Sequence, residues 1–233
     1  MGALLALFST DLKRTLACSS MSQIGFITVG LSTMVLLGEH GSFAAYGTVM
    51  HMANHSLIKL VLFMAAGVVY MNTHSLDLNV IRGYGRRKIV LHLCFLLGAL
   101  SIACIPPIGS GYNSKSLLHE AILELIVHNQ EHGHIWMPYK AAEILFLISG
   151  GLTVAYMIKL FVVLFVDCPA EGAEWTANAS ASSKAAKKPY MTRTTAFALL
   201  APAVLLPIMG MFPHQTMDRL ANLSMSFFGA EHL

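Results

Sequence analysis

The chain has 233 residues, of which 55% are hydrophobic and 12% are charged, and its formal net charge at pH 7 is +3. Soluble domains carry roughly 25% charged residues, so this composition excludes an ordinary soluble protein and indicates several membrane spans. The excess of Lys and Arg lies in loops between apolar segments, so it indicates membrane topology and not nucleic-acid binding.

The first ten residues are apolar but cover only about half of a membrane span. No basic stretch precedes them, which argues against a signal peptide. We interpret them as the last turns of a helix that begins upstream, so that the sequence is a fragment or one part of a split subunit. Five longer apolar segments are predicted to be transmembrane helices of an all-α bundle, at residues 16–37, 44–71, 89–105, 141–166 and 194–211.

Basic residues are concentrated in alternate loops, which predicts the orientation of the chain. The loops at 38–42 and 128–138 contain no Lys or Arg. Under the positive-inside rule the three basic loops are cytoplasmic, and they contain Lys13, Arg14, Arg82, Arg86, Arg87, Lys88, Lys184, Lys187, Lys188 and Arg193. Residues 167–192 are then a cytoplasmic linker, 193–212 the last transmembrane helix, and 213–233 an interfacial tail on the outer side.

The helix predicted at 44–71 contains His51, His55 and Lys59. Their spacing of four residues places them on one face, in a stripe roughly 12 Å long. A charged side chain at this depth costs at least about 3 kcal/mol, so it faces a protein interior or an aqueous cavity. Imidazole titrates near neutrality, and a buried amine can do so because burial disfavours its charged form. The stripe therefore predicts a proton relay.

Other interpretations of these histidines are weaker. A single His in a helix is usually a packing residue, and two histidines without a third ligand, beside a cationic Lys59, do not suit a metal. A haem would need a facing axial ligand, and His92 lies near the cytoplasmic end of its segment. The cysteines form no CxxC pair, so they indicate neither a cluster nor a disulfide framework, and they are Cys18, Cys94, Cys104 and Cys168. We predict no cofactor.

The segment that follows 89–105 predicts a broken helix. Prolines and glycines that cannot continue a regular helix precede Lys115, and they are Pro106, Pro107, Gly109 and Gly111. A helical run is expected to resume at 116–127. Non-helical backbone at membrane depth survives only inside protein or beside water, and such breaks mark ion sites in transporters. The alternative is an ordinary loop between two helices.

Further ionisable residues extend outward from Lys115. His119, Glu120 and Glu124 are candidates for further relay or exit positions, and a solvated polar loop is the alternative explanation. Lys159, about two turns from a cytoplasmic helix end, either takes part in the relay or extends its amine to the membrane surface.

Three motifs resemble those of one family of membrane subunits. Residues 10–25, TDLKRTLACSSMSQIG, resemble its TDIKRxLAYSxxSQxG signature. His51, His55, Lys59, Leu62, Phe63 and Gly67 resemble its HxxxHxxxKxxLFxxxG helix, and 106–115 resembles its PPxxGFxSK broken helix. By this resemblance, which covers residues 10–166, the chain is similar to the antiporter-like subunits of respiratory complex I, membrane-bound hydrogenases and multi-subunit cation/proton antiporters.

The resemblance implies a role for each of these residues. Residues 1–166 would be the second of two inverted five-helix repeats, lacking the start of its first helix. Lys59 would be the central protonatable lysine, His51 and His55 its bridging relay, and Lys115 the broken-helix lysine. The partners implied are other membrane subunits, including the missing first-repeat half, in a prokaryotic inner membrane.

The predicted function is translocation of protons, with Na⁺ as an alternative, within a redox-driven or antiport complex. This chain itself would carry no redox chemistry. Ser116 stands where complex I relatives often have an acid, so His119 and Glu120 are expected to take over that role. The competing hypotheses are a non-translocating structural subunit and a haem- or metal-binding membrane subunit.

Overall fold

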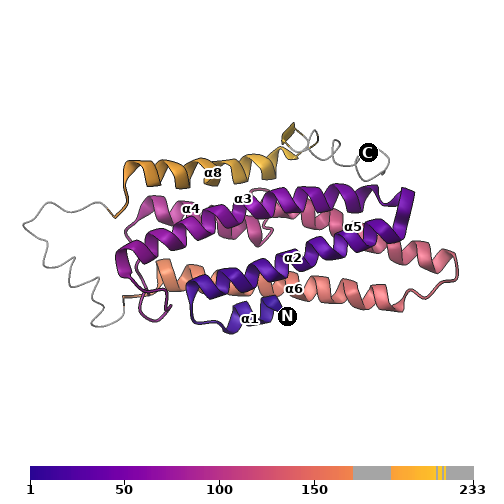
Figure 1. Ribbon diagram of the computed structural model, residues 1–233, viewed down its shortest axis with the longest axis horizontal. Helices are drawn as coiled ribbons and strands as arrows, with labels where there is room; N and C mark the ends of the chain where they lie inside the picture. The colour runs from indigo at the N-terminus through magenta and orange to yellow at the C-terminus, as the bar shows by residue number, and fades with distance from the viewer. Residues whose placement is uncertain (170–189, 214, 217, 219–233) are drawn as a thin grey trace, which may run out of the picture.

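The computed structural model describes residues 1–169, 190–213, 215, 216 and 218. They form an all-α bundle whose long helices run along one axis, which confirms the predicted fold class (Figure 1). The helices are α1 (Gly2–Phe8), α2 (Leu12–Leu37), η1 (Gly38–His40), α3 (Ser42–Thr73), α4 (Ile89–Ile102), α5 (Gly111–Glu131), α6 (Met137–Phe161), η2 (Val162–Val166) and α8 (Arg193–Met211). The predicted linker lies largely outside the described residues, as does most of the predicted tail.

Among the described residues, four helices are long and apolar enough to cross a membrane. They are α2, α3, α6 with its extension η2, and α8. The fifth predicted span is the apolar helix α4, which has only 14 residues. A helix of that length is about 21 Å long and falls short of a hydrocarbon core of about 30 Å.

Local sequence signals set where several of these helices begin and end. Asp11 precedes α2, and its carboxylate accepts a hydrogen bond from the backbone N–H of Arg14 at 2.7 Å. Thr192 caps α8 in the same way through the N–H of Thr195. Such caps satisfy donors that have no partner inside the helix. Gly38, with φ of +58°, ends α2 in a conformation that side chains disfavour.

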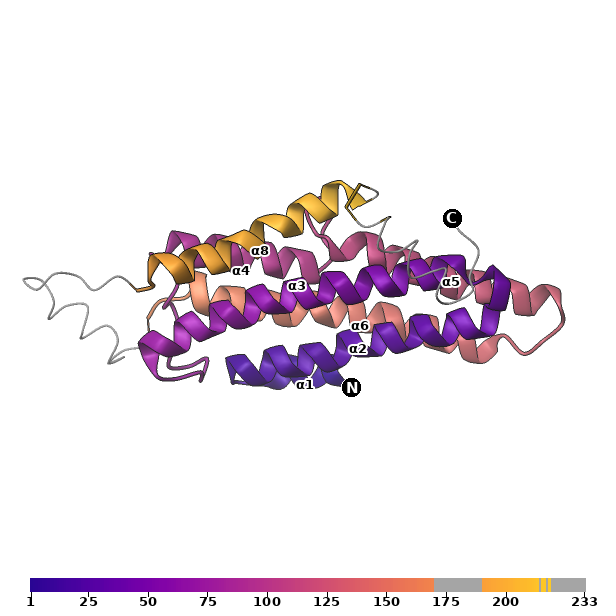
Figure 2. The same cartoon turned by 45° about the horizontal axis from the view of Figure 1, so that its top comes forward.

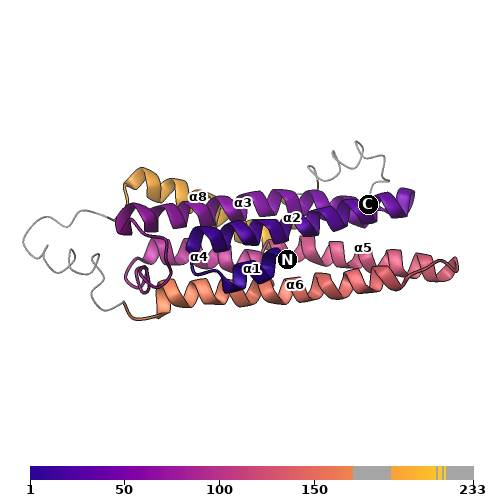
Figure 3. The same ribbon diagram turned by 60° about the horizontal axis from the view of Figure 1, so that its bottom comes forward.

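The predicted break separates α4 from α5, which follow one another along the bundle axis (Figure 3). A Cβ on Gly109 would lie 2.7 Å from the carbonyl oxygen of Leu100, so the close return of the chain requires glycine there. The position of the second helix differs from the prediction. It begins at Gly111 and ends at Glu131, so Lys115 lies inside its first turns. The helix can begin at Gly111 because both prolines lie before it in the sequence.

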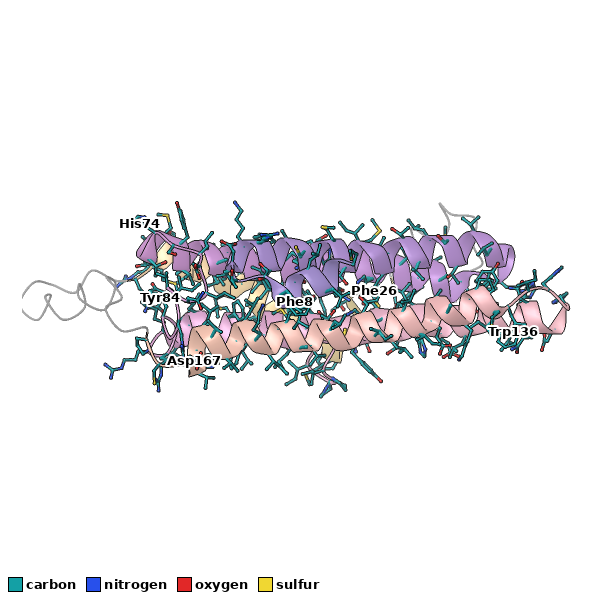
Figure 4. All side chains as sticks on the ribbon, turned by 90° about the horizontal axis from the view of Figure 1, so that it is seen from below. Phe8, Phe26, His74, Tyr84, Trp136 and Asp167 are labelled. Atoms are coloured by element: carbon teal, nitrogen blue, oxygen red, sulfur yellow. The ribbon has the colours of Figure 1, made fainter. Side chains whose placement is uncertain are left out.

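The loops gather at two opposite ends of the bundle. The connection before α2 pairs with the loop after α3, because Leu12 donates to the carbonyl of Leu76 at 2.9 Å and Leu78 donates to that of Thr10 at 2.8 Å. Arg82 also forms a 3.0 Å ion pair with Asp167. Figure 4 shows His74, Tyr84 and Asp167 at this end and Trp136 at the other. The described basic loops therefore share one end, as the predicted topology requires.

Helix α3 lies at the centre of the packing. It contacts α2, α4, α5 and α8, whereas the short α1 packs against α2 and α6. Turning the molecule shows α8 along the outside of α3 and α4 (Figure 2). Because α3 is enclosed by neighbours from several directions, the polar residues His51, Asn54 and Lys59 in its middle turns are buried.

Candidate functional site

Lys59 lies in the middle of α3 and is buried, with 7% of its surface exposed. Its Nζ donates to the carbonyl oxygen of Leu16 at 2.9 Å and to the hydroxyl of Ser19 at 2.8 Å. The Ser19 hydroxyl in turn lies 2.6 Å from the Tyr156 hydroxyl. The amine is therefore held by polar groups of α2 and α6 inside the bundle, and it does not reach for the lipid surface.

His51 and His55 continue from Lys59 along the same face of α3. Their rings are 6.4 Å apart between centroids and nearly parallel, with 16° between the planes. Nδ1 of His51 lies 3.0 Å from the hydroxyl of Ser114, which precedes Lys115 on α5. The Nε2 atoms of both histidines are buried and have no hydrogen-bond partner among the described residues. Each imidazole thus keeps a nitrogen available for an additional proton donor or acceptor.

Lys115 lies where the two halves of the broken helix meet. It is 9% exposed, and its Nζ lies 3.4 Å from the carbonyl oxygen of Ile102, the last residue of α4. The amine also lies 4.6 Å from the centre of the Phe26 ring. Free carbonyls at a helix C-terminus and an aromatic face both attract a cation. The break therefore creates a place where an amine can be charged inside the bundle.

The break is fixed to α3 by a second contact. Nδ2 of Asn54 donates to the carbonyl oxygen of Ser110 at 2.9 Å. Asn54 lies between the two histidines in sequence and is almost fully buried. This bond holds the start of α5 beside His51.

Beyond Lys115, His119 meets a carboxylate of α6. Nε2 of His119 lies 3.3 Å from Glu143, which also forms an ion pair with Lys140. Glu143 is 6% exposed, whereas Lys140 is exposed. Between Lys115 and this pair the Phe26 and Phe146 rings lie 4.7 Å apart. Figure 4 places Phe26 near the middle of the bundle; its ring contacts Lys115, and the Phe146 ring stacks on that of His119 with 6.1 Å between centroids.

The other predicted residues lie in two separate places. Glu120 and Glu124 line a pocket of about 500 Å³ between the start of α3 and α5, together with His40 and His128. Lys159 contacts the end of α1, where its amine donates to the carbonyl oxygens of Ala6, Leu7 and Ser9 at 3.3, 2.6 and 2.6 Å. Neither Glu120 nor Glu124 has a contact with His119 among the hydrogen bonds of the described residues.

Sequence reasoning missed several residues of this site, among them Glu143, Ser19 and Tyr156. Glu143 is inside an apolar segment, and its charge was the available signal. Ser19 and Tyr156 are polar residues within apolar helices, and such residues are too common to be singled out. His92, considered as a haem ligand, packs against the rings of Phe161 and Phe165.

Comparison with known proteins places the chain in a family. Residues 1–129 match the family model described as NADH:quinone oxidoreductase/Mrp antiporter, TM. The chain is 30% identical over 173 residues to formate hydrogenlyase subunit 3 of Escherichia coli, and 29% identical over 162 residues to NADH-quinone oxidoreductase subunit L of the same organism. These matches cover 72% and 69% of this chain but only 28% and 23% of the relatives.

Solved structures agree on the fold. A chain of the Mrp complex from Dietzia matches with a TM-score of 0.75 and 20% identity, covering 97% of this chain and 44% of that chain. The chain thus spans less than half of that protein and about a quarter of the curated relatives. It is an integral membrane protein that belongs to the NADH:quinone oxidoreductase/Mrp antiporter transmembrane family.

Proposed function

We propose that this chain is part of a proton-translocating membrane subunit, in which Lys59, His55, His51 and Lys115 exchange protons in that spatial order. The observation that carries the proposal is the position of these four groups. They lie along the inside of one bundle, from the middle of α3 to the break between α4 and α5, with Ser114 bonded to His51. Burying four ionisable groups at membrane depth costs free energy, and a bundle with only a structural role would not need them.

The chemistry of the groups favours protons over Na⁺. Sodium and other hard cations are held by oxygen atoms, whereas this row offers amines and imidazoles. A neutral imidazole has one donor and one acceptor nitrogen, so it can take a proton on one side and release it on the other. His51 and His55 keep their Nε2 atoms without a partner among the described residues, which leaves them ready for this exchange.

Lys115 is proposed to be the outer member of the row. Its amine is stabilised as a cation by the C-terminal carbonyl of α4 and by the Phe26 ring. His119 and Glu143 lie further out, beside the exposed Lys140, and are proposed to pass the proton to the aqueous side. Glu120 and Glu124 line the neighbouring pocket and could supply the same outlet.

The setting of the chain is part of the proposal. Its relatives include a formate hydrogenlyase subunit and an NADH-quinone oxidoreductase subunit, and one structural match comes from an Mrp complex. We therefore propose that it works with other membrane subunits, including the part that carries the first repeat, in a prokaryotic cell membrane. The end with the basic loops is proposed to face the cytoplasm, and any redox reaction would take place in partner subunits.

The test is proton pumping by the complex containing this chain, reconstituted in vesicles. Lys59→Ala is expected to abolish pumping, because it removes the central amine, and to leave assembly intact. Lys13→Ala, at an exposed lysine in the first turn of α2, serves as the control and should pump normally. Normal pumping by Lys59→Ala would contradict the proposal, and pumping that depends on external Na⁺ would replace the proton by Na⁺.

A further inference from the structure

The amine of Lys59 is contacted most closely by a serine and not by a histidine of the relay. Ser19 accepts its hydrogen bond at 2.8 Å and lies 2.6 Å from the hydroxyl of Tyr156. Ser19 and Tyr156 have no exposed surface. The two hydroxyls thus connect Lys59 on α3, through α2, to α6.

The ammonium group of Lys59 has more N–H donors than the described residues provide acceptors for. A lysine ammonium has three N–H groups. Leu16 and Ser19 accept two hydrogen bonds, and the described residues supply no third acceptor to this amine. His55, one helical turn along α3, has a buried Nε2 that likewise lacks a partner within the described part of the chain. One N–H of Lys59 and one ring nitrogen of His55 therefore lack a partner among the described residues, on neighbouring turns of the same helix.

We infer that Ser19 and Tyr156 are positioning residues for the proposed relay. They fix the amine of Lys59 so that two of its N–H groups are occupied and the third remains for exchange with His55. This inference rests on the proposed function and adds to it a specific arrangement on the side of Lys59 that faces α2 and α6. Tyr156 acts through Ser19, because its hydroxyl bonds to Ser19 and not to the amine.

Hydroxyl groups suit this task better than a carboxylate would. A serine hydroxyl has one donor and two acceptor sites, so Ser19 can stay bonded to an amine with two or with three hydrogens. A carboxylate in the same place would pair strongly with the ammonium and hold it charged. The Ser19–Tyr156 pair therefore orients Lys59 without preventing it from releasing its proton.

The same interface provides a matched control. Ser22 and Ser149 form a second hydroxyl pair between α2 and α6, at 2.9 Å. Ser22 lies three residues after Ser19, about one helical turn further along α2. The hydrogen bonds of Lys59 do not include Ser22 or Ser149. Removing this pair tests the packing of the interface alone.

The experiment measures proton pumping at several pH values, assembly and turnover in the complex that contains this chain. Ser19→Ala should lower pumping at least about tenfold, because it removes a hydrogen bond to a charged group. Tyr156→Phe should lower it about threefold, and both variants should displace the pH profile. Ser19→Thr, which keeps the hydroxyl, and Ser22→Ala should pump normally. The double variant of Ser19→Ala with Tyr156→Phe should match Ser19→Ala alone.

Equal losses in Ser19→Ala and Ser22→Ala with an unchanged pH profile would overturn the inference, because the hydroxyls would then act only in packing. Normal pumping and an unchanged profile in both Ser19→Ala and Tyr156→Phe would overturn it while leaving the proposed function intact, provided that Lys59→Ala is inactive. If Ser19→Ala does not assemble, Tyr156→Phe, which keeps the aromatic ring, decides by the same criteria.

Discussion

Two lysines of this protein, the buried Lys59 and the half-buried Lys159, hold their amines in different ways. Lys159 on α6 donates to three carbonyl oxygens at the end of α1, so each of its N–H groups has an acceptor. Lys59 on α3 has two acceptors, Leu16 and Ser19, and lies one turn from a histidine nitrogen without a partner among the described residues. The first amine completes a helix terminus, whereas the second retains capacity for exchange.

Under the proposed function, this difference is expected to separate a structural cation from the lysine that moves a proton. Carbonyls at a helix C-terminus have no partner within the helix and attract a cation. A fully bonded ammonium there loses one of its hydrogen bonds and weakens the other two if it releases a proton, so Lys159 is expected to act as a cation that joins α6 to α1 (Figure 3). Lys59 has one N–H group without an acceptor among the described residues, so releasing that proton breaks no hydrogen bond there. The number of satisfied N–H groups therefore predicts which lysine takes part in transport.

The largest expected effect is a crossed pattern between these two lysines. Lys59→Met should reduce pumping to below about a tenth while the assembled complex keeps its thermal stability. Lys159→Met should lower stability by about 1–3 kcal/mol, because it leaves three carbonyls of α1 without their cation. Pumping per assembled complex by Lys159→Met should stay near normal. Thermal inactivation and vesicle pumping, measured side by side, check both halves.

Lys159→Arg is the control for this comparison, because it keeps a cation at the end of α1 and should restore most of the stability. Loss of pumping in Lys159→Met at normal assembly and stability would show that Lys159 belongs to the relay, and the distinction between the two lysines would fail.

A smaller effect is expected where α2, α3 and α5 approach closely. A Cβ at Gly30 would collide with Thr48 of α3 and with Leu118 of α5. Gly30→Ala should therefore lower the free energy of unfolding by about 1–3 kcal/mol, because overpacking forces the helices apart. At Gly25 an added Cβ meets no atom within 4 Å among the described residues, so Gly25→Ala is the matched control. Thermal inactivation of the purified complex compares the two.

The packing at Gly30 also bears on Lys59, since the contacts of Lys59 require α2 to remain against α3. Gly30→Ala should also lower pumping, whereas it should leave the contact between Lys159 and α1 intact. Equal stability in Gly30→Ala and Gly25→Ala would contradict the helix packing described here.

The smallest expected effect concerns Glu143, an acid that is paired on both sides. Glu143→Gln keeps the shape of the side chain and a hydrogen bond to His119 but removes the charge that pairs with Lys140. We expect pumping to fall about threefold, because hydrogen bonds to charged groups are stronger than those to neutral ones. Proton pumping in vesicles at a saturating driving force measures this fall. A complete loss would make Glu143 a required carrier, and no change would restrict the outlet to Glu120 and Glu124.

Much of the fold follows from local properties of the sequence. The apolar segments at 16–37, 44–71, 141–166 and 194–211 appear as helices within a few residues of the predicted bounds, because a span of lipid requires a continuous apolar helix. The break before α5 also follows from its prolines and glycines. The start of α5 at Gly111 was predicted five residues late, because the polar run 112–115 is itself helical. The helix propensity of that run is a weak signal, and tertiary contacts outweigh it.

What the sequence determined by itself is the row on α3. A spacing of four residues places His51, His55 and Lys59 on one face of any helix, whatever surrounds it. The partners of these groups depend on how the helices pack: Ser19 and Tyr156 for Lys59, Glu143 for His119, and the end of α1 for Lys159. Periodicity within a helix fixes which residues share a face, but it leaves open which helix that face meets. The packing of side chains between α2, α3, α5 and α6 selects those neighbours, and this information is spread over the whole chain.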